Sequence, residues 1–254
     1  MNRVASALLG MMLMCTPATA MVGGAPPAAG EIARSPVLIV GSRGNSCTGT
    51  AIARDLVLTA AHCVPGDAEY KRVEFDAARR PILKDVARIA RHPGFDLNAM
   101  LAHRATADVA LIKLAEPLPD VTVPAELGVR VPRAAGETFV VAGFGVTVRN
   151  DGKTGGTLRT ATLVATGRPG SLQLRLVDPA TRNTRAGLGA CTGDSGAPAF
   201  EQADGRTVVI GVVSWSTGPN NTDGCGGLTG VTPLANYRAW IVEQARRMGS
   251  PVGP

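Results

Sequence analysis

The sequence predicts an all-β protein made of antiparallel barrels or a sandwich, and three features support this prediction. Glycine (31 residues) and proline (18) are abundant among the 254 residues, whereas aromatic residues make up only 4%. Short runs of Val, Ala, Leu and Thr alternate with turn residues, a pattern that favours turn-dense β structure over helices. The apolar fraction of 45% suffices for one domain, or for two small halves that share a core.

Seven segments have the composition of strands. Each is short, rich in β-branched residues and bounded by Gly, Pro, Asn or Asp. No internal repeat or long linker marks a separate domain, and the spacing of the segments suits antiparallel pairing. We expect strands at residues 37–40, 48–53, 56–60, 109–114, 138–142, 158–165 and 208–214.

One segment has the periodicity of a helix, and two have the composition of loops. Basic residues occupy the last turn of the expected helix, residues 236–247, as is typical of a helix C-terminus. Residues 146–157 and 216–227 are rich in Gly, Asn, Asp and Thr, so we expect loops there. Four apolar side chains share one face of the helix: Tyr237, Trp240, Ile241 and Ala245.

The first 20 residues have the parts of a secretory signal peptide. Arg3 precedes an apolar run that ends at Met14, and the small residues Ala18 and Ala20 stand where a signal peptidase cleaves. The alternative is an uncleaved anchor, but the run is too short to cross a bilayer about 30 Å thick. We therefore expect a signal peptide at residues 1–20 and a mature domain at 21–254. The mature protein is expected to be secreted or periplasmic and not to bind a membrane.

The positive charge is dispersed along the chain. The net charge is +6, and the longest basic clusters are pairs such as Arg79-Arg80 and Arg246-Arg247. Proteins that bind nucleic acid gather Lys and Arg on one face. The sequence therefore predicts no nucleic-acid partner.

Four cysteines remain once the signal peptide, with Cys15, is removed. An even number in an exported chain indicates two disulfides, and four cysteines permit three pairings. A zinc site is the competing interpretation, but no Cys-x-x-Cys pair and no histidine cluster supports it. The four are Cys47, Cys63, Cys191 and Cys225.

The three histidines differ in their surroundings. His62 ends an apolar run and adjoins Cys63, so a disulfide there would hold its imidazole in a fixed position, as a general base requires. His92 and His103 lie in polar loops, where we expect structural or solvent-facing roles.

An aspartate and a serine complete the candidate catalytic residues. Asp108 opens the apolar run DVALIKL, where a buried carboxylate needs a hydrogen-bond donor such as an imidazole. A turn or cap role for Asp108 is equally compatible with this position. Ser195 lies in GDSGAP, after Asp194 and before Gly196, which indicates either an exposed nucleophile on a tight turn or an ordinary surface turn.

Three motifs place these residues in one order along the chain. LTAAHC contains His62, DVALIKL contains Asp108 and GDSGAP contains Ser195. Together with MVGG at 21–24 and SWS at 214–216, they resemble the trypsin/chymotrypsin-like serine peptidases, which share the order His, Asp, Ser. The resemblance covers nearly the whole mature length. It implies two packed six-stranded antiparallel Greek-key barrels, at 21–125 and 126–236, followed by a C-terminal α-helix at 236–247.

The resemblance also implies a role for each catalytic residue. Ser195 would be the nucleophile, His62 its general base and later the general acid, and Asp108 would orient the imidazole. The backbone N–H groups of Gly193 and Ser195 would form the oxyanion hole. The disulfides would be Cys47–Cys63 and Cys191–Cys225.

A further role falls to Asp194, which in this family pairs with the amine of the mature N-terminus. Here MVGG begins at Met21, directly after the predicted signal cleavage site. We expect signal peptidase itself to free the amine that activates the enzyme.

The substrate-binding residues implied by the resemblance carry no charge. We expect substrate to pair as an added strand with SWS, and a medium apolar side chain such as Leu, Met, Val or Phe to precede the cleaved bond. Asp223, in the long 216–227 loop, could instead reach the pocket and favour Arg or Lys. The substrate-binding group comprises Gly189, Ala190, Thr192, Ser214, Trp215, Ser216 and Gly230.

The leading hypothesis is thus an exported serine endopeptidase acting on proteins or peptides. A non-catalytic protein-binding module of the same fold is the alternative, although such proteins usually lack one of the three catalytic residues, all of which are present here. No motif calls for a metal or an organic cofactor. We expect a monomer that a protein inhibitor can block.

Overall fold

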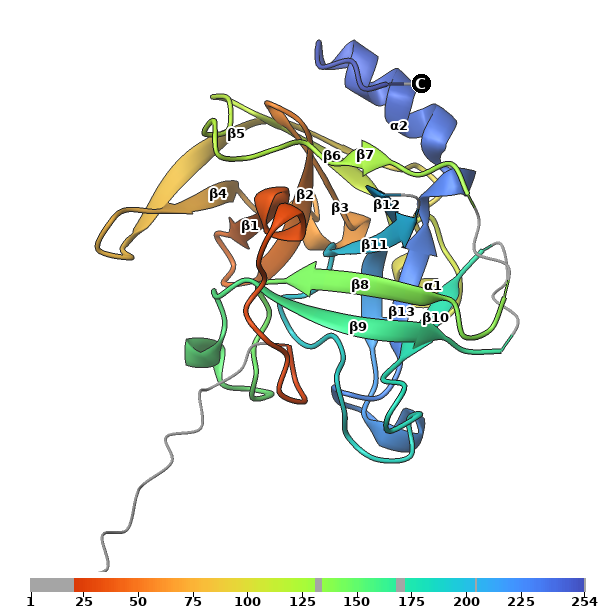
Figure 1. The fold of residues 1–254 in the computed structure, drawn as a ribbon. Coiled ribbons are helices and arrows are strands. Elements are labelled where there is room, and N and C mark those ends of the chain that lie inside the picture. The colour runs from red at the N-terminus through yellow and green to blue at the C-terminus, as the bar shows by residue number, and fades with distance from the viewer. Residues whose placement is uncertain (1–20, 131–133, 168–171, 204, 254) are drawn as a thin grey trace, which may run out of the picture.

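Two β-barrels pack against each other in the computed structural model, which describes residues 21–130, 134–167, 172–203 and 205–253 (Figure 1). Six strands close the first barrel in the order β1-β2-β3-β6-β5-β4. They are β1 (Pro36–Gly41), β2 (Ser46–Ala53), β3 (Leu56–Thr59), β4 (Tyr70–Phe75), β5 (Pro81–Arg91) and β6 (Ala110–Leu114).

The second barrel repeats this topology. Its six strands are ordered β11-β8-β9-β10-β13-β12, and pairing of β11 with β12 closes the ring. In both halves the fourth strand lies beside the first, and the second and third follow, which is the Greek-key order. The strands are β8 (Thr138–Gly143), β9 (Arg159–Ala165), β10 (Leu174–Val177), β11 (Pro198–Ala203), β12 (Arg206–Ser216) and β13 (Thr229–Pro233).

A short seventh strand and a few helices complete the fold. The two residues of β7 (Glu126–Leu127) add to the second barrel parallel to β12. The α-helices are α1 (Leu97–Leu101) and, at the C-terminal end, α2 (Arg238–Arg247). Single 3₁₀ turns are η1 (Glu31–Arg34), η2 (Ala61–Cys63), η3 (Gly152–Thr154), η4 (Pro219–Asn221) and η5 (Leu234–Asn236).

Three apolar clusters explain which strands the sequence could predict. One cluster fills each barrel, and the third lies between the barrels and beneath α2. In β3, Val57 belongs to the core of the first barrel, whereas Leu56 and Leu58 belong to the layer between the barrels. Both faces of this strand are buried, so its sequence is a continuous apolar run.

The all-β fold class with two six-stranded barrels and a C-terminal helix is confirmed. All seven expected strands are present, but β4, β5, β7, β10, β11 and β13 are additional to the prediction. Strands β4 and β5 were not predicted because charged residues interrupt their apolar pattern and no residue of β5 is fully buried. The α-helix begins at Arg238 and not at Asn236, because Asn236 belongs to the turn η5 and Tyr237 separates that turn from the helix.

The predicted signal peptide, residues 1–20, lies outside the described residues and stays a prediction. Across the part of the chain that the structure describes, no helix has the length and apolar character needed to span a membrane.

Candidate active site

A cavity of about 320 Å³ lies where the two barrels meet, and both barrels contribute to its walls. The first barrel supplies residues from the start of β2 and from the turn η2, and the second supplies the 191–195 segment and the end of β12. The lining residues are Asn45, Ser46, Cys47, His62, Cys191, Thr192, Gly193, Ser195 and Ser216. The cavity thus brings His62 and Ser195 together from distant parts of the sequence.

His62 is held from two sides. It lies in η2, directly after β3, and its neighbour Cys63 is bonded to Cys47 of β2. Its backbone N–H donates to Asp108 Oδ1 at 2.9 Å, and its ring Nδ1 lies 2.8 Å from Asp108 Oδ2. A carboxylate oxygen can only accept, so the proton of this second bond belongs to Nδ1 and leaves Nε2 able to accept another.

Asp108 is fully buried, just before β6, and its carboxylate accepts a third hydrogen bond. The donor is Ser214 Oγ, 2.5 Å from Asp108 Oδ2. Three donors compensate a carboxylate whose burial would otherwise be costly. The sequence assigned Ser214 to substrate binding through its backbone, and its side chain proves to be part of this buried network.

Hydrogen bonds to both barrels hold the turn that carries Ser195. The carbonyl of Ser195 accepts from Thr48 N of β2 at 2.8 Å, and Gly196 N donates to Val213 O of β12 at 2.7 Å. In the described part of the chain, Ser195 Oγ makes no hydrogen bond. The hydrogen bond between a catalytic hydroxyl and its general base is often long in unliganded enzymes and shortens when substrate binds.

Two N–H groups beside Ser195 donate to no acceptor among the described residues. They belong to Gly193 and Ser195 itself, both of which line the cavity. Gly193 has φ +93°, a backbone conformation that favours glycine, and a Cβ there would lie 2.9 Å from Gly145 Cα. Thr48 Oγ1 donates to Gly193 O at 2.9 Å and so helps to hold this peptide in place. These N–H groups can together bind an oxyanion.

The carboxyl of Asp194 is buried behind this turn. It accepts hydrogen bonds from the backbone N–H of Gly145 and Cys191, each at 2.9 Å. Burial raises its pKa from 3.8 to about 7, and the two hydrogen bonds oppose that rise. No basic side chain among the described residues forms an ion pair with it. A Cβ on Gly143 or Gly145 would collide with this carboxyl, at 2.1 Å and 2.4 Å.

The residues expected to form the mature N-terminus are buried in the second barrel. Met21 is fully buried and belongs to that barrel's apolar core. The next residue, Val22, forms a β-bridge with Gly189. Residues 21 and 22 therefore pack beside the segment that leads to Asp194.

The predicted substrate-binding residues divide into two sets. Thr192 and Ser216 line the cavity with His62 and Ser195. Gly189 and Ala190 are buried and do not line it, and Ala190 N donates to Thr229 Oγ1 at 3.0 Å.

Gly230 lies against the indole of Trp215. A Cβ on Gly230 would come within 2.1 Å of that ring, so the missing side chain makes room for the indole. The resemblance placed Gly230 in the substrate-binding group, and in the structure it accommodates Trp215.

Two residues that the sequence did not connect to the site cover Trp215. His103 stacks on the indole with centroids 4.5 Å apart and planes 20° apart, and the Arg175 guanidinium lies 5.8 Å from the ring centroid. Trp215 is consequently 7% exposed. Both contacts join residues far apart in the chain, and no local motif indicates them.

His92 has the structural role that its sequence context predicted. Its ring packs against Tyr237 and Trp240 with centroids 5.1 Å and 5.0 Å away, and its Nδ1 accepts from Gly94 N at 3.0 Å. Burial lowers the pKa of His92, which favours the neutral ring that this acceptor role requires.

An ion pair joins the two loops beside the site. Arg149 Nη2 lies 2.5 Å from Asp223 Oδ2, linking the 146–157 loop to the 216–227 loop. The Asp223 side chain is 90% exposed. Its carboxylate is therefore directed to Arg149 and solvent and does not line the cavity of Ser195.

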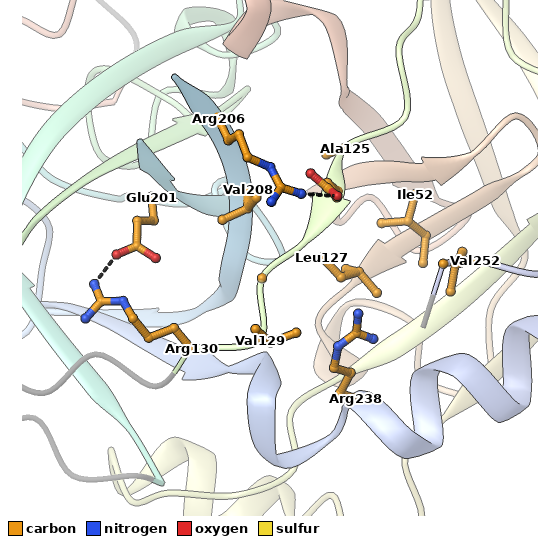
Figure 2. A pocket seen from close by; sticks show the side chains of 13 residues that line it. Ile52, Ala125, Leu127, Val129, Arg130, Glu201, Arg206, Val208, Arg238 and Val252 are labelled. Carbon is orange, nitrogen blue, oxygen red and sulfur yellow. Dashed lines mark hydrogen bonds and ion pairs between the residues drawn. The ribbon is translucent and has the colours of Figure 1, made fainter. Parts of the chain in front are cut away.

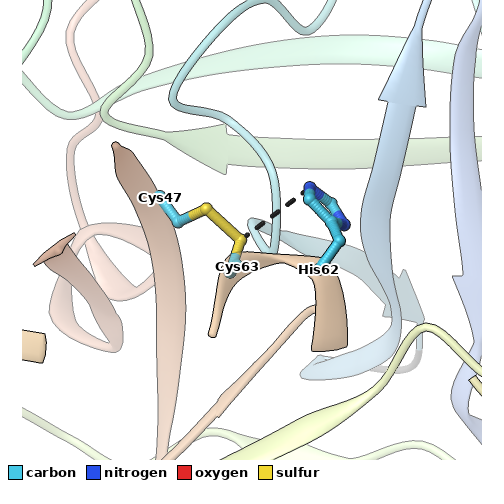
Figure 3. A group of neighbouring side chains, drawn as sticks. All are labelled: Cys47, His62 and Cys63. Carbon is cyan, nitrogen blue, oxygen red and sulfur yellow. Dashed lines mark hydrogen bonds between the residues drawn. A yellow bond between two sulfur atoms is a disulfide. The ribbon is translucent and has the colours of Figure 1, made fainter. Parts of the chain in front are cut away.

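Cys47, His62 and Cys63 lie close enough together to suggest a metal site, but their chemistry does not fit one. The two sulfurs are bonded to each other, and neither is a thiolate (Figure 3). The contact between His62 Nε2 and Cys63 Sγ, at 4.0 Å, is the dashed line in Figure 3. The second disulfide implied by the resemblance, Cys191–Cys225, is also present and joins the nucleophile segment to the 216–227 loop.

Comparison with known proteins finds similarity to one family model and to several proteins named as proteases. The Trypsin family model matches residues 21–241. A trypsin-like protease of Streptomyces glaucescens is 30% identical over 242 residues, which cover 89% of this chain and 82% of the relative. The CLIP domain-containing serine protease B4 of Anopheles gambiae is 29% identical, with 80% of this chain and 63% of the relative covered. Snake venom serine protease rhinocerase 4 of Bitis rhinoceros is 29% identical, with 82% and 81% covered.

Proposed function

Because the chain belongs to the trypsin family, whose named relatives are serine proteases, we propose that it is an exported serine endopeptidase. One observation carries the proposal. His62, which is hydrogen-bonded to Asp108 and through it linked to Ser214, shares a cavity with Ser195 and with two backbone N–H groups that donate to no acceptor in the described part of the chain.

The geometry supports a definite sequence of proton transfers. Asp108 holds the Nδ1 proton of His62, so that Nε2 takes the proton of Ser195 Oγ as this oxygen attacks the carbonyl carbon of the substrate. The carbonyl oxygen becomes negative and accepts hydrogen bonds from the N–H groups of Gly193 and Ser195. His62 then donates its proton to the leaving amine, and water repeats the cycle on the acyl-enzyme. Each oxyanion donor contributes roughly 10²- to 10³-fold to the rate.

The preferred substrate is a protein or peptide with a medium apolar residue before the cleaved bond. The substrate strand would pair with the backbone at Ser214 to Ser216. Gly189 and Ala190 offer no charge to a basic side chain, and the carboxylate of Asp223 is engaged by Arg149. These features support Leu, Met, Val or Phe over Arg or Lys.

Activation would follow directly from export. Signal cleavage after Ala20 would free the amine of Met21, whose pairing with Asp194 would hold the oxyanion turn in place. Burial of both residues supports this step, as does the lack of a cation beside Asp194 among the described residues. The mature protein would act in the periplasm or outside the cell as a monomer, and a protein inhibitor that occupies the cavity would block it.

The experiment is intact-mass measurement after treatment with a fluorophosphonate, on protein exported through its own signal. We expect one adduct on a chain that begins at Met21, and no adduct on Ser195→Ala or His62→Ala. No adduct on a correctly processed chain would contradict the peptidase and favour a binding module of the same fold. An adduct on a chain that begins elsewhere would contradict activation by signal cleavage alone.

A further inference from the structure

A second cavity, of about 390 Å³, lies next to the start of β12, and Figure 2 shows the side chains that line it. Its walls come from β2, from β7 and the residues after it, from β11 and β12, and from α2 and the C-terminal segment. Strand β12 has 11 residues, with Arg206 at this cavity and Ser216 at the catalytic one. At about 3.3 Å per residue, the two cavities are about 30 Å apart along the strand.

Apolar side chains from both barrels and from the end of the chain meet in this cavity. Ile52 comes from the first barrel, Val208 from the second, and Leu127 from the short strand β7 between them. Val252 closes the side next to α2 (Figure 2). The volume falls in the range of small-molecule sites, which are about 300–1,000 Å³ and mostly apolar with a few polar groups.

Carboxylates of the described residues engage two of the three arginines that line the cavity. Arg206 is paired with Glu126, and Arg130 is paired with both Glu201 and Glu137. The third lining arginine, Arg238, forms no ion pair with any described residue. Its side chain rises from α2 toward Leu127 and Val252, between the apolar walls (Figure 2).

The position of Arg238 on its helix places its guanidinium beside a second source of positive charge. Arg238 is the first residue of α2, and no side chain caps the N-terminus of that helix. The N–H groups of the first turn therefore contribute partial positive charge beside the guanidinium. An anion at Arg238 would be stabilised by both.

We propose that this cavity binds a small carboxylic acid with a medium-length apolar chain. The carboxylate pairs with Arg238, because it is the lining cation that no carboxylate of the described chain already occupies. The chain of the ligand lies on Ile52, Leu127 and Val208. Because these residues come from the two barrels and the strand between them, the bound ligand contacts both barrels and stabilises their packing. This site is separate from Ser195 and does not depend on the proposed peptidase activity.

The test uses the full mature chain with octanoate and, as an uncharged match, 1-octanol. Calorimetric titration gives the two dissociation constants, and thermal unfolding gives the stabilisation of the protein. We expect octanoate to bind more tightly than octanol and to raise the melting temperature. We expect Arg238→Gln to weaken octanoate by about tenfold or more, as for loss of a hydrogen bond to a charged group, and to leave octanol unchanged.

Two further variants separate specific loss of ligand binding from loss of folding and from a general effect of removing a positive charge. Arg247→Gln is the matched control, because Arg247 lies on the same helix but is paired with Glu243 and does not line the cavity. Val252→Phe narrows the cavity and should weaken both ligands. Equal binding of octanoate and octanol, no binding of octanoate at millimolar concentration, or equal losses in Arg238→Gln and Arg247→Gln would overturn the proposal.

Discussion

The free amine at Met21 should change the pH dependence of stability through Asp194. In a form extended upstream of residue 21, Met21 carries a peptide nitrogen and presents no ammonium group. Among the described residues, the buried carboxyl of Asp194 then accepts hydrogen bonds from the N–H groups of Gly145 and Cys191 alone, and its pKa is about 7 in place of 3.8. We predict that this extended form loses stability on passing from acidic to neutral pH, whereas the mature form does not.

The direction and size of the effect follow from proton binding. Between about pH 4 and 7 the folded extended form binds one proton more than the unfolded chain, so its free energy of unfolding falls as pH rises. A shift of about 3 pKa units, at about 1.4 kcal/mol each, makes the loss about 4 kcal/mol by neutral pH. In the mature form the ammonium keeps the carboxylate charged and removes this loss. Its own deprotonation then lowers stability only at alkaline pH, above its unfolded reference of about 8.

The assay is denaturant unfolding of both forms at a series of pH values, with a one-residue extension, Ala20, as the altered form. Asp194→Asn in the extended form is the control: it cannot ionise, so the fall between pH 4 and 7 should disappear. Parallel pH profiles for the extended and mature forms would refute the reasoning, because the amine would then have no electrostatic contact with Asp194.

Three further predictions concern the backbone, a disulfide and specificity. Gly196→Ala should lower the free energy of unfolding by about 2 kcal/mol or more in denaturant titrations. The φ angle of Gly196 is +78°, and a Cβ there would lie 2.1 Å from Thr59 Oγ1. Gly152→Ala is the control and should change the free energy of unfolding little, because no atom lies within 4 Å of a Cβ at that position. Replacing Cys47 and Cys63 together by serine should cost about 3 kcal/mol, given their separation of 16 residues, and an unchanged denaturation midpoint would contradict this. Asp223→Asn should leave the ratio of kcat/KM for Leu and Arg peptides unchanged, and a selective loss of Arg cleavage would mean that Asp223 reaches the pocket.

A strand could be predicted from the sequence where its own residues show the pattern of a strand. The run LVLT of β3 is apolar throughout because both of its faces are buried, and such runs are visible without knowledge of any neighbour. Strand β5 has no fully buried residue and is ordered by its pairing with β4 and β6. Its charged side chains are compatible with a loop as much as with a strand, so its own sequence could not distinguish them.

The sequence by itself determined the candidate chemistry: three motifs in a fixed order name His62, Asp108 and Ser195, and the cysteine count limits the disulfides to three arrangements. Only the tertiary structure decided which groups meet outside those motifs. Barrel closure brings His103 onto Trp215, pairs Arg149 with Asp223, and places Arg238 at a cavity where no described carboxylate pairs with it. The physical reason is the distance along the chain over which each kind of information acts. A motif encodes neighbours along the chain, whereas stacking, charge pairing and cavity shape depend on side chains that only the packed barrels bring within a few ångströms of each other.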